Sequence, residues 1–108
     1  MRWTIHLLPE AEAELVAMPA DIRARFVHVA ELLQNFGPQQ VGMPHIRHLE
    51  GKLWEMRMKG RDGIARAVYV ARTGQRLTVV HVSIKKTQKT PRRALETARA
   101  RLEKLTHD

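Results

Sequence analysis

The chain has 108 residues, a length typical of a single domain, and carries 19 Lys and Arg against 11 Asp and Glu, for a net charge of +8. It has no cysteine, which excludes disulfides, thiolate nucleophiles and cysteine-bearing zinc sites. No secretory-type leader and no apolar run near the roughly 18 residues that span a bilayer are present. We therefore expect one cytoplasmic domain over residues 1–108.

The positive charge is concentrated in the second half of the chain. Residues 1–50 hold four basic and six acidic residues, a net of −2, whereas residues 51–108 hold 15 and five, a net of +10. Charge segregated in this way indicates a polyanionic partner, and RNA or DNA is the first candidate.

The first third of the sequence predicts a strand followed by a helical hairpin. The apolar-leaning run 3–8 predicts a strand that ends at Pro9. Alternating glutamates favour the first turn of a helix over residues 10–18, because acids complement the positive helix end. Its buried side is expected to be Leu15, Val16 and Met18. Pro19 suits the start of a second helix, which Gly37-Pro38 ends. The apolar stripe of that helix is Ile22, Phe26, Val29, Ala30, Leu33 and Phe36.

Residues 37–52 are predicted to form a loop. His45 and His48 have the spacing of a metal-binding pair, but the sequence marks no third ligand, and we predict no metal site. After residue 52 the apolar period becomes two, which predicts three strands joined by short turns at 59–63 and 73–75. The strands are expected over 53–59, 64–72 and 77–84, as an antiparallel meander.

The last segment predicts a helix that starts at Thr90-Pro91, a capping side chain followed by proline at the first helical position. Its buried stripe is expected to be Leu95, Ala98, Leu102 and Leu105. Its outer faces are expected to carry Arg92, Arg93, Arg99, Arg101 and Lys104. The order of elements predicts an α+β fold, with an N-terminal strand and helical hairpin packed on an antiparallel sheet and a C-terminal helix.

Strand alternation predicts a cationic face on the meander. The core side is expected to be Met56, Met58, Val80, Val82 and Ile84. The opposite, solvated side would then display Arg57, Arg66 and His81, with Lys85 and Lys86 at the strand end. Gathered cations indicate a phosphate site. The RNA-binding residues expected around it are Lys59, Thr87, Gln88, Lys89, Arg92 and Arg93.

These side chains suit cleavage of RNA without a metal or other cofactor. Arg57 and Arg66 could hold the phosphate with forked donors, and His81, Lys85 or Lys86 could move protons. The few acids of the second half are a poor supply for a two-metal nuclease. Two structural alternatives stay open. His81 could be a packed residue, and the lysine-rich run could only increase solubility.

Several stretches of the chain together resemble the phage-derived HigB-like toxins of the RelE superfamily. They are the helical segment 15–23, Leu-Glu-Gly-Lys-Leu-Trp-Glu-Met-Arg at 49–57, Gly-Ile-Ala-Arg at 63–66, Val-His at 80–81 and Lys-Lys-Thr-Gln-Lys-Thr-Pro at 85–91. The resemblance implies the toxin of a type II toxin–antitoxin pair that cleaves mRNA at the ribosome and leaves a cyclic phosphate and a 5′-hydroxyl. It also implies a HigA-like helix-turn-helix antitoxin and binding of promoter DNA through the complex.

By position in the resemblance, Arg57 and Arg66 match strand residues that stabilise the scissile phosphate, and Lys85 and Lys86 match the segment that completes the site. The sequence departs from the best-known RelE pattern because residues 85–108 hold no tyrosine. His81 or a lysine would have to replace it as the base.

Two further expectations concern partners and alternatives. The same fold could instead serve a non-catalytic toxin that poisons a topoisomerase, or a nucleic-acid-binding module. In either toxin, we expect an acidic segment of the antitoxin to cover or neighbour the basic face.

Overall fold

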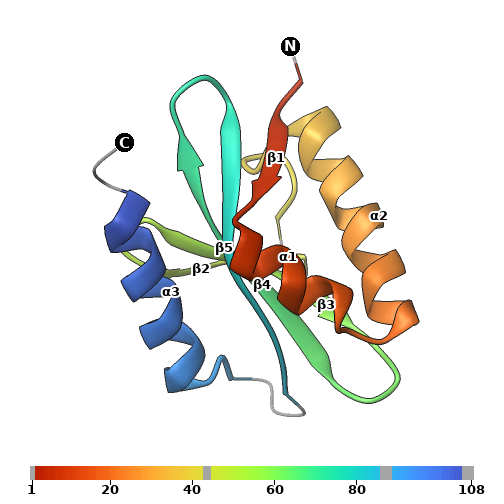
Figure 1. The fold of residues 1–108 in the computed structure, drawn as a ribbon. Helices are drawn as coiled ribbons and strands as arrows, with labels where there is room; N and C mark the ends of the chain where they lie inside the picture. Colours follow the sequence, from red (N-terminus) through yellow and green to blue (C-terminus); the bar gives the residue numbers. More distant parts are fainter. Residues whose placement is uncertain (1, 43–44, 86–88, 106–108) are drawn as a thin grey trace.

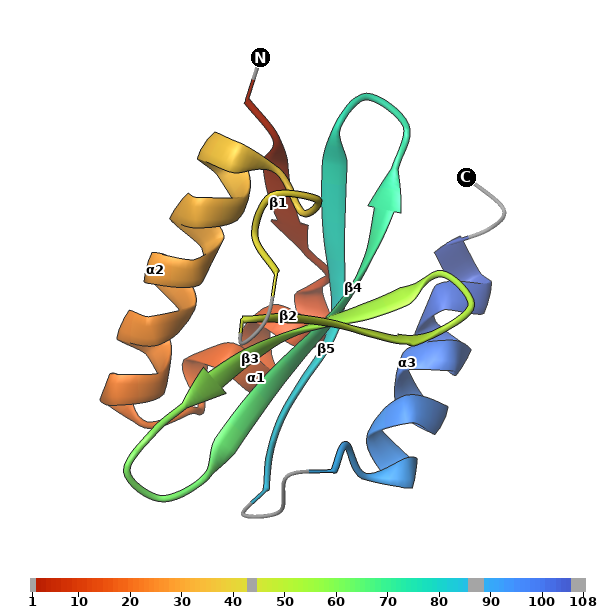
Figure 2. The same cartoon turned by 180° about the vertical axis from the view of Figure 1, so that it is seen from behind.

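A computed structural model describes residues 2–42, 45–85 and 89–105. A central sheet separates α1 and α2 on one face from α3 on the other (Figure 1), and Figure 2 shows the same layers from behind. The elements are β1 (Thr4–Leu7), α1 (Pro9–Val16), α2 (Ala20–Phe36), β2 (Ile46–Glu50), β3 (Leu53–Lys59), β4 (Ile64–Arg72), β5 (Arg76–Lys85) and α3 (Arg92–Leu105). Within the described residues, no helix is long and apolar enough to cross a membrane.

The sheet is mixed, with the strand order β1-β5-β4-β3-β2. The predicted meander is present as antiparallel β3, β4 and β5. The predicted loop 37–52 is wrong over Ile46–Glu50, because this segment pairs with β3 as a further antiparallel strand. The N-terminal strand β1 pairs in parallel with the first half of β5, from Thr4 opposite Arg76 to Leu7 opposite Val79. The α+β architecture is as the sequence predicts.

The main core lies between the sheet and the α1–α2 pair. Four of the residues predicted for the stripe of α2 are buried there: Ile22, Phe26, Val29 and Leu33. The prediction fails at two positions near helix ends, since Phe36 is 57% exposed and Val16 is 66% exposed. The helix α2 ends where Gly37 adopts a φ of +81°, and a Cβ there would lie 2.8 Å from Nε1 of Trp3. Glycine at this position thus allows the close packing of Trp3.

A second, smaller core lies between the sheet and α3. A register shift between Val68 and Tyr69 places Val68 opposite His81 but Tyr69 opposite Val79, so Val80 is an extra residue in β5. The bulge turns Val80 toward α3, where it packs with Val68 and Ala98. The prediction that Val80 shares a face with Val82 is therefore wrong, and Val79 takes that place in the main core.

Candidate nucleic-acid site

The basic residues predicted on the meander share the sheet face that lies toward α3. In the ladder, Arg57 pairs with Arg66 and Arg66 with Ser83, while Ile64 pairs with both Lys59 and Lys85. Residues that pair directly in antiparallel strands point to the same side. The guanidinium and ammonium groups therefore project from neighbouring positions of three strands, as strand alternation predicts.

The prediction that this face is solvated is wrong. Arg66 has no exposed surface, and the side chains of Arg57 and His81 are only 14% and 12% exposed. The reason is that α3 and Thr90 just before it pack over this face. Thr90, just before α3, is itself buried. Arg66 therefore has no surface with which to contact an RNA strand.

A buried carboxylate lies between the two strand arginines. Glu55 is completely buried, with Oε2 3.3 Å from Nε of Arg57 and Oε1 3.8 Å from Nε of Arg66. The hydroxyl of Thr90, predicted as a helix cap, donates to Oε1 of Glu55 over 2.6 Å. The pKa of Arg66 is lowered, chiefly by burial. The negative charge of Glu55 raises this pKa, whereas the positive charges of Arg57 and Arg47 lower it further. We call Glu55, Arg57, Arg66 and Thr90 the buried arginine cluster.

His81 lies in a separate group with Glu14 and Arg101, two residues that the sequence did not predict to be near it. Its Nδ1 is 3.0 Å from Oε1 of Glu14 on α1 and 3.3 Å from Nη1 of Arg101 on α3. Arg101, predicted on an outer face, instead donates to both carboxylate oxygens of Glu14, at 2.8 and 3.1 Å, and to the carbonyl of Val80. The backbone N–H of Val82 also donates to Glu14. The carboxylate thus ties α1, β5 and α3 together.

This carboxylate can fix the orientation of the imidazole. Nδ1 of His81 lies nearer to Glu14 than to Arg101. If Nδ1 carries the proton, it donates a hydrogen bond to Glu14. The unprotonated Nε2 is then the nitrogen that can accept a proton, the arrangement by which a carboxylate prepares a histidine as a base.

The same contacts make stability depend on Glu14 at low pH. Burial raises the pKa of Glu14, but hydrogen bonds from Arg101 and the Val82 N–H, with the nearby charges, outweigh it, so the pKa lies below its ordinary 4.5. A carboxyl group whose pKa is lower in the folded than in the unfolded state stabilises the fold at pH values above its unfolded-state pKa. This stabilisation is lost as the pH falls through the folded-state pKa. We expect urea unfolding at pH 7 and pH 3 to show a smaller acid-induced loss of stability for Glu14→Gln than for wild type. An equal loss in both proteins would contradict this assignment.

The end of β5 and the start of α3 enclose a small hollow of about 240 Å³. It is lined by His81, Ser83, Lys85, Pro91, Arg93, Ala94 and Thr97. The hollow brings together three of the predicted site residues: His81, Lys85 and Arg93. Ser83, which the sequence analysis missed, has a buried Oγ without a hydrogen-bond partner among the described residues. A short polar residue between apolar strand positions gave no distinguishing signal.

The other predicted residues take different places. Lys86, Thr87 and Gln88 lie outside the described residues. Lys59 and Lys89 are exposed and do not line the hollow. Arg92 is on the outer face of α3, with Nε 3.9 Å from the carboxylate of Glu96 one turn later.

The histidine and tyrosine positions have structural explanations. His48 donates a hydrogen bond from Nε2 to the carbonyl of Gly51, and its ring lies against Trp54 with the ring centroids 4.7 Å apart. His45 lies beside the ring of His28. Over residues 2–42, 45–85 and 89–105, no cluster of three metal-ligating side chains occurs. Tyr69 is buried in the main core, where burial raises its pKa, and cannot serve as a base at the hollow.

Solved structures share this fold at low sequence identity. A chain of the archaeal RelE–RelB complex from Pyrococcus horikoshii OT3 superposes with a TM-score of 0.60 and 16% identity, over 82% of this chain and 100% of that chain. A chain of the toxin–antitoxin complex RelBE2 from Mycobacterium tuberculosis superposes with a TM-score of 0.57 and 16% identity, over 79% of this chain and 100% of that chain. These similarities define a protein with the RelE fold.

The family follows from the sequence itself. The model of the family described as phage-derived protein Gp49-like (DUF891) matches residues 13–103, and the chain belongs to that family. Together with the fold, this match confirms the expected membership of the RelE superfamily and the phage-derived character of the group. No curated protein matches the sequence.

Proposed function

We propose that the protein is the toxin of a type II toxin–antitoxin pair and a ribosome-dependent mRNA endonuclease that uses no metal ion. Its family and its fold support the toxin assignment, since the two similar structures are a toxin–antitoxin complex and a RelE–RelB complex. The observation that supports catalysis is the hollow, where an imidazole, an ammonium and a guanidinium group lie beside a buried hydroxyl.

In the proposed reaction, the substrate's own 2′-hydroxyl attacks the adjacent phosphorus. His81, oriented by Glu14, accepts the 2′ proton through Nε2. Lys85 and Arg93 hold the phosphate oxygens as charge develops on them, and Ser83 can donate a further hydrogen bond. The new bond joins the 2′-oxygen to phosphorus while the bond to the 5′-oxygen breaks. That oxygen takes a proton, for which Lys86 remains a candidate by sequence position. The products are a cyclic phosphate and a 5′-hydroxyl.

In this proposal Arg57 and Arg66 become positioning residues rather than phosphate ligands. The cluster holds the guanidinium groups of Arg57 and Arg66 around Glu55, and Arg66 pairs in the ladder with Ser83, which lines the hollow. Through Glu55 it also holds Thr90, three residues before Arg93. The cluster thus positions the start of α3 over the end of β5.

The partners follow from the same assignment. We expect a HigA-like helix-turn-helix antitoxin, binding to promoter DNA through the complex, and the ribosome and mRNA as targets. The site of action would be the cytoplasm. The excess of positive charge in residues 51–108 would steer the domain toward RNA.

Induced expression followed by mapping of RNA 5′ ends tests the nuclease. We expect cuts within translated messages, phased with codons, whose downstream fragments carry a 5′-hydroxyl and therefore accept a kinase label without prior dephosphorylation. Uncut messages in arrested cells would contradict the proposal.

The non-catalytic alternative gains one argument from the structure. Arg66 is buried and paired with a carboxylate, so the strand arginines themselves do not form an open phosphate site. A topoisomerase poison with this fold would induce the DNA-damage response while messages stay intact. The same induced cultures therefore separate the two functions.

A further inference from the structure

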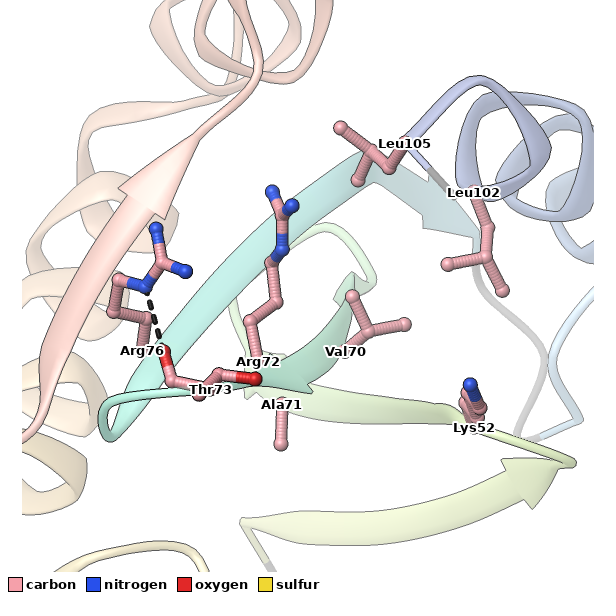
Figure 3. A pocket seen from close by; sticks show the side chains of 8 residues that line it. All are labelled: Lys52, Val70, Ala71, Arg72, Thr73, Arg76, Leu102 and Leu105. Carbon is pink, nitrogen blue, oxygen red and sulfur yellow. Dashed lines mark hydrogen bonds between the residues drawn. The ribbon is translucent and has the colours of Figure 1, made fainter. Parts of the chain in front are cut away.

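A second hollow lies at the other end of α3, between its last turn and the turn that joins β4 to β5 (Figure 3). It has a volume of about 340 Å³ and is lined by Lys52, Val70, Ala71, Arg72, Thr73, Arg76, Leu102 and Leu105. We call it the hairpin groove. None of its lining residues belongs to the hollow that contains His81 and Lys85.

The groove combines an apolar side with cations. Val70, Leu102 and Leu105 belong to the edge of the smaller core, and both leucines are only partly buried. Figure 3 shows these leucines on the α3 side and the guanidinium groups of Arg72 and Arg76 on the hairpin side. No acidic residue is among the described residues that line the groove. The groove thus offers leucine contacts beside the cationic side chains of Lys52 and Arg76.

The orientation of Arg76 is fixed from within the chain. Its Nε donates to the carbonyl of Thr73 over 2.8 Å, within the turn that joins the two strands. This hydrogen bond uses Nε and directs the planar guanidinium, so that its Nη groups remain as donors for an acceptor outside the turn. Guanidinium groups held in this way pair well with carboxylates.

We propose that the hairpin groove binds an acidic, leucine-bearing helix of the antitoxin. The identity of the partner as the antitoxin rests on the proposed function. The leucines would pack on the α3 side of the groove, and glutamate or aspartate side chains of the same helix would meet Arg76 and Lys52. A nucleic acid fits less well, because no aromatic side chain among the described residues lines the groove for base stacking.

The position of the groove has a consequence for neutralisation. Arg93 at one end of α3 and Leu105 at the other are separated by about 18 Å along the helix axis, at a rise of about 1.5 Å per residue. A helix in the groove would anchor the antitoxin without filling the candidate active site. Another part of the antitoxin would then have to reach the site, or the bulk of the complex would keep the toxin from the ribosome.

Fluorescence anisotropy with a synthetic peptide tests the groove directly. The probe is a labelled 20-residue helix with leucine at the a and d heptad positions and glutamate at most of the others. We expect the wild-type domain to bind it, and Arg76→Glu to raise the Kd about tenfold or more, as for loss of a well-placed charge pair. Arg25→Glu, an exposed change of equal charge on α2, is the matched control and should leave the Kd near that of wild type.

Three results would overturn the inference. Equal weakening by Arg76→Glu and Arg25→Glu, or equal binding of a peptide with serine in place of leucine, would mean attraction by net charge alone. Weakened binding of a uridine 20-mer by Arg76→Glu, with peptide binding intact, would assign the surface to nucleic acid instead. Peptide binding is measured without RNA cleavage, so a failure of the nuclease proposal would not alter this readout.

Discussion

Replacing Glu55 by glutamine should lower the free energy of unfolding by roughly 3–5 kcal/mol, the effect typical of removing one partner from a buried ion pair. Among the described residues, Glu55 is the only carboxylate that lies between Arg57 and Arg66, and it also accepts a hydrogen bond from the hydroxyl of Thr90. Glutamine keeps the volume of the side chain but removes the negative charge that lies between two largely buried guanidinium groups. Urea unfolding of the isolated domain at pH 7 measures the difference.

A matched change on the surface provides the control. Glu96 is 59% exposed and pairs loosely with the exposed Arg92, so Glu96→Gln should unfold at nearly the wild-type urea concentration. Similar midpoints for Glu55→Gln and Glu96→Gln would show that the buried arginine cluster does not hold the α3 side of the fold together.

Lys85→Met should slow RNA cleavage by about 10²–10³-fold while the domain keeps its stability, the loss expected when one preorganised donor to a developing anion is removed. Lys85 is exposed at the end of β5 and lines the hollow with His81 and Arg93. Methionine retains the length of the side chain and removes the charge. Cleavage of a translated message in a purified system, with the 5′ ends quantified by primer extension, gives the rate.

The comparison with two other positions makes this result specific. Lys104→Met changes the same charge at the far end of α3 and should cleave at nearly the wild-type rate. Arg66→Met should instead act mainly through stability, because Arg66 is buried and cannot touch the RNA. If Lys85→Met retains the wild-type rate, the hollow is not the active site.

The sequence predicted most helices and strands correctly, but it predicted less well which side chains they bury. The meander, the helical hairpin and the last helix follow from local periodicity and turn signals, which a few neighbouring residues determine. The strand Ile46–Glu50 was missed because only two of its five residues, Ile46 and Leu49, are apolar. The bulge at Val80 was missed because Val79 and Val80 are the same residue type, and neither face of the strand could be identified there.

The candidate site was predicted in part for a related reason. Alternation correctly placed Arg57, Arg66, His81 and Lys85 on one face, but it could not show that α3 packs on that same face. The contacts that bury the charges join distant parts of the chain. Glu14 and Arg101 are 87 residues apart, and Glu55 and Thr90 are 35 apart. No local pattern in the sequence identifies such pairs.

The parallel pairing of β1 with β5 and the attachment of Glu14 to Arg101 also bear on how the domain is made. Contacts between distant segments form late, so folding dominated by them is slow. During synthesis β1 cannot pair until β5 has been made. The hollow likewise lacks the side formed by residues 91–97 until these have emerged from the ribosome. A nascent chain therefore carries its cationic strands before the hollow is complete, so under the proposed function the message being translated would stay uncut until the last helix has docked.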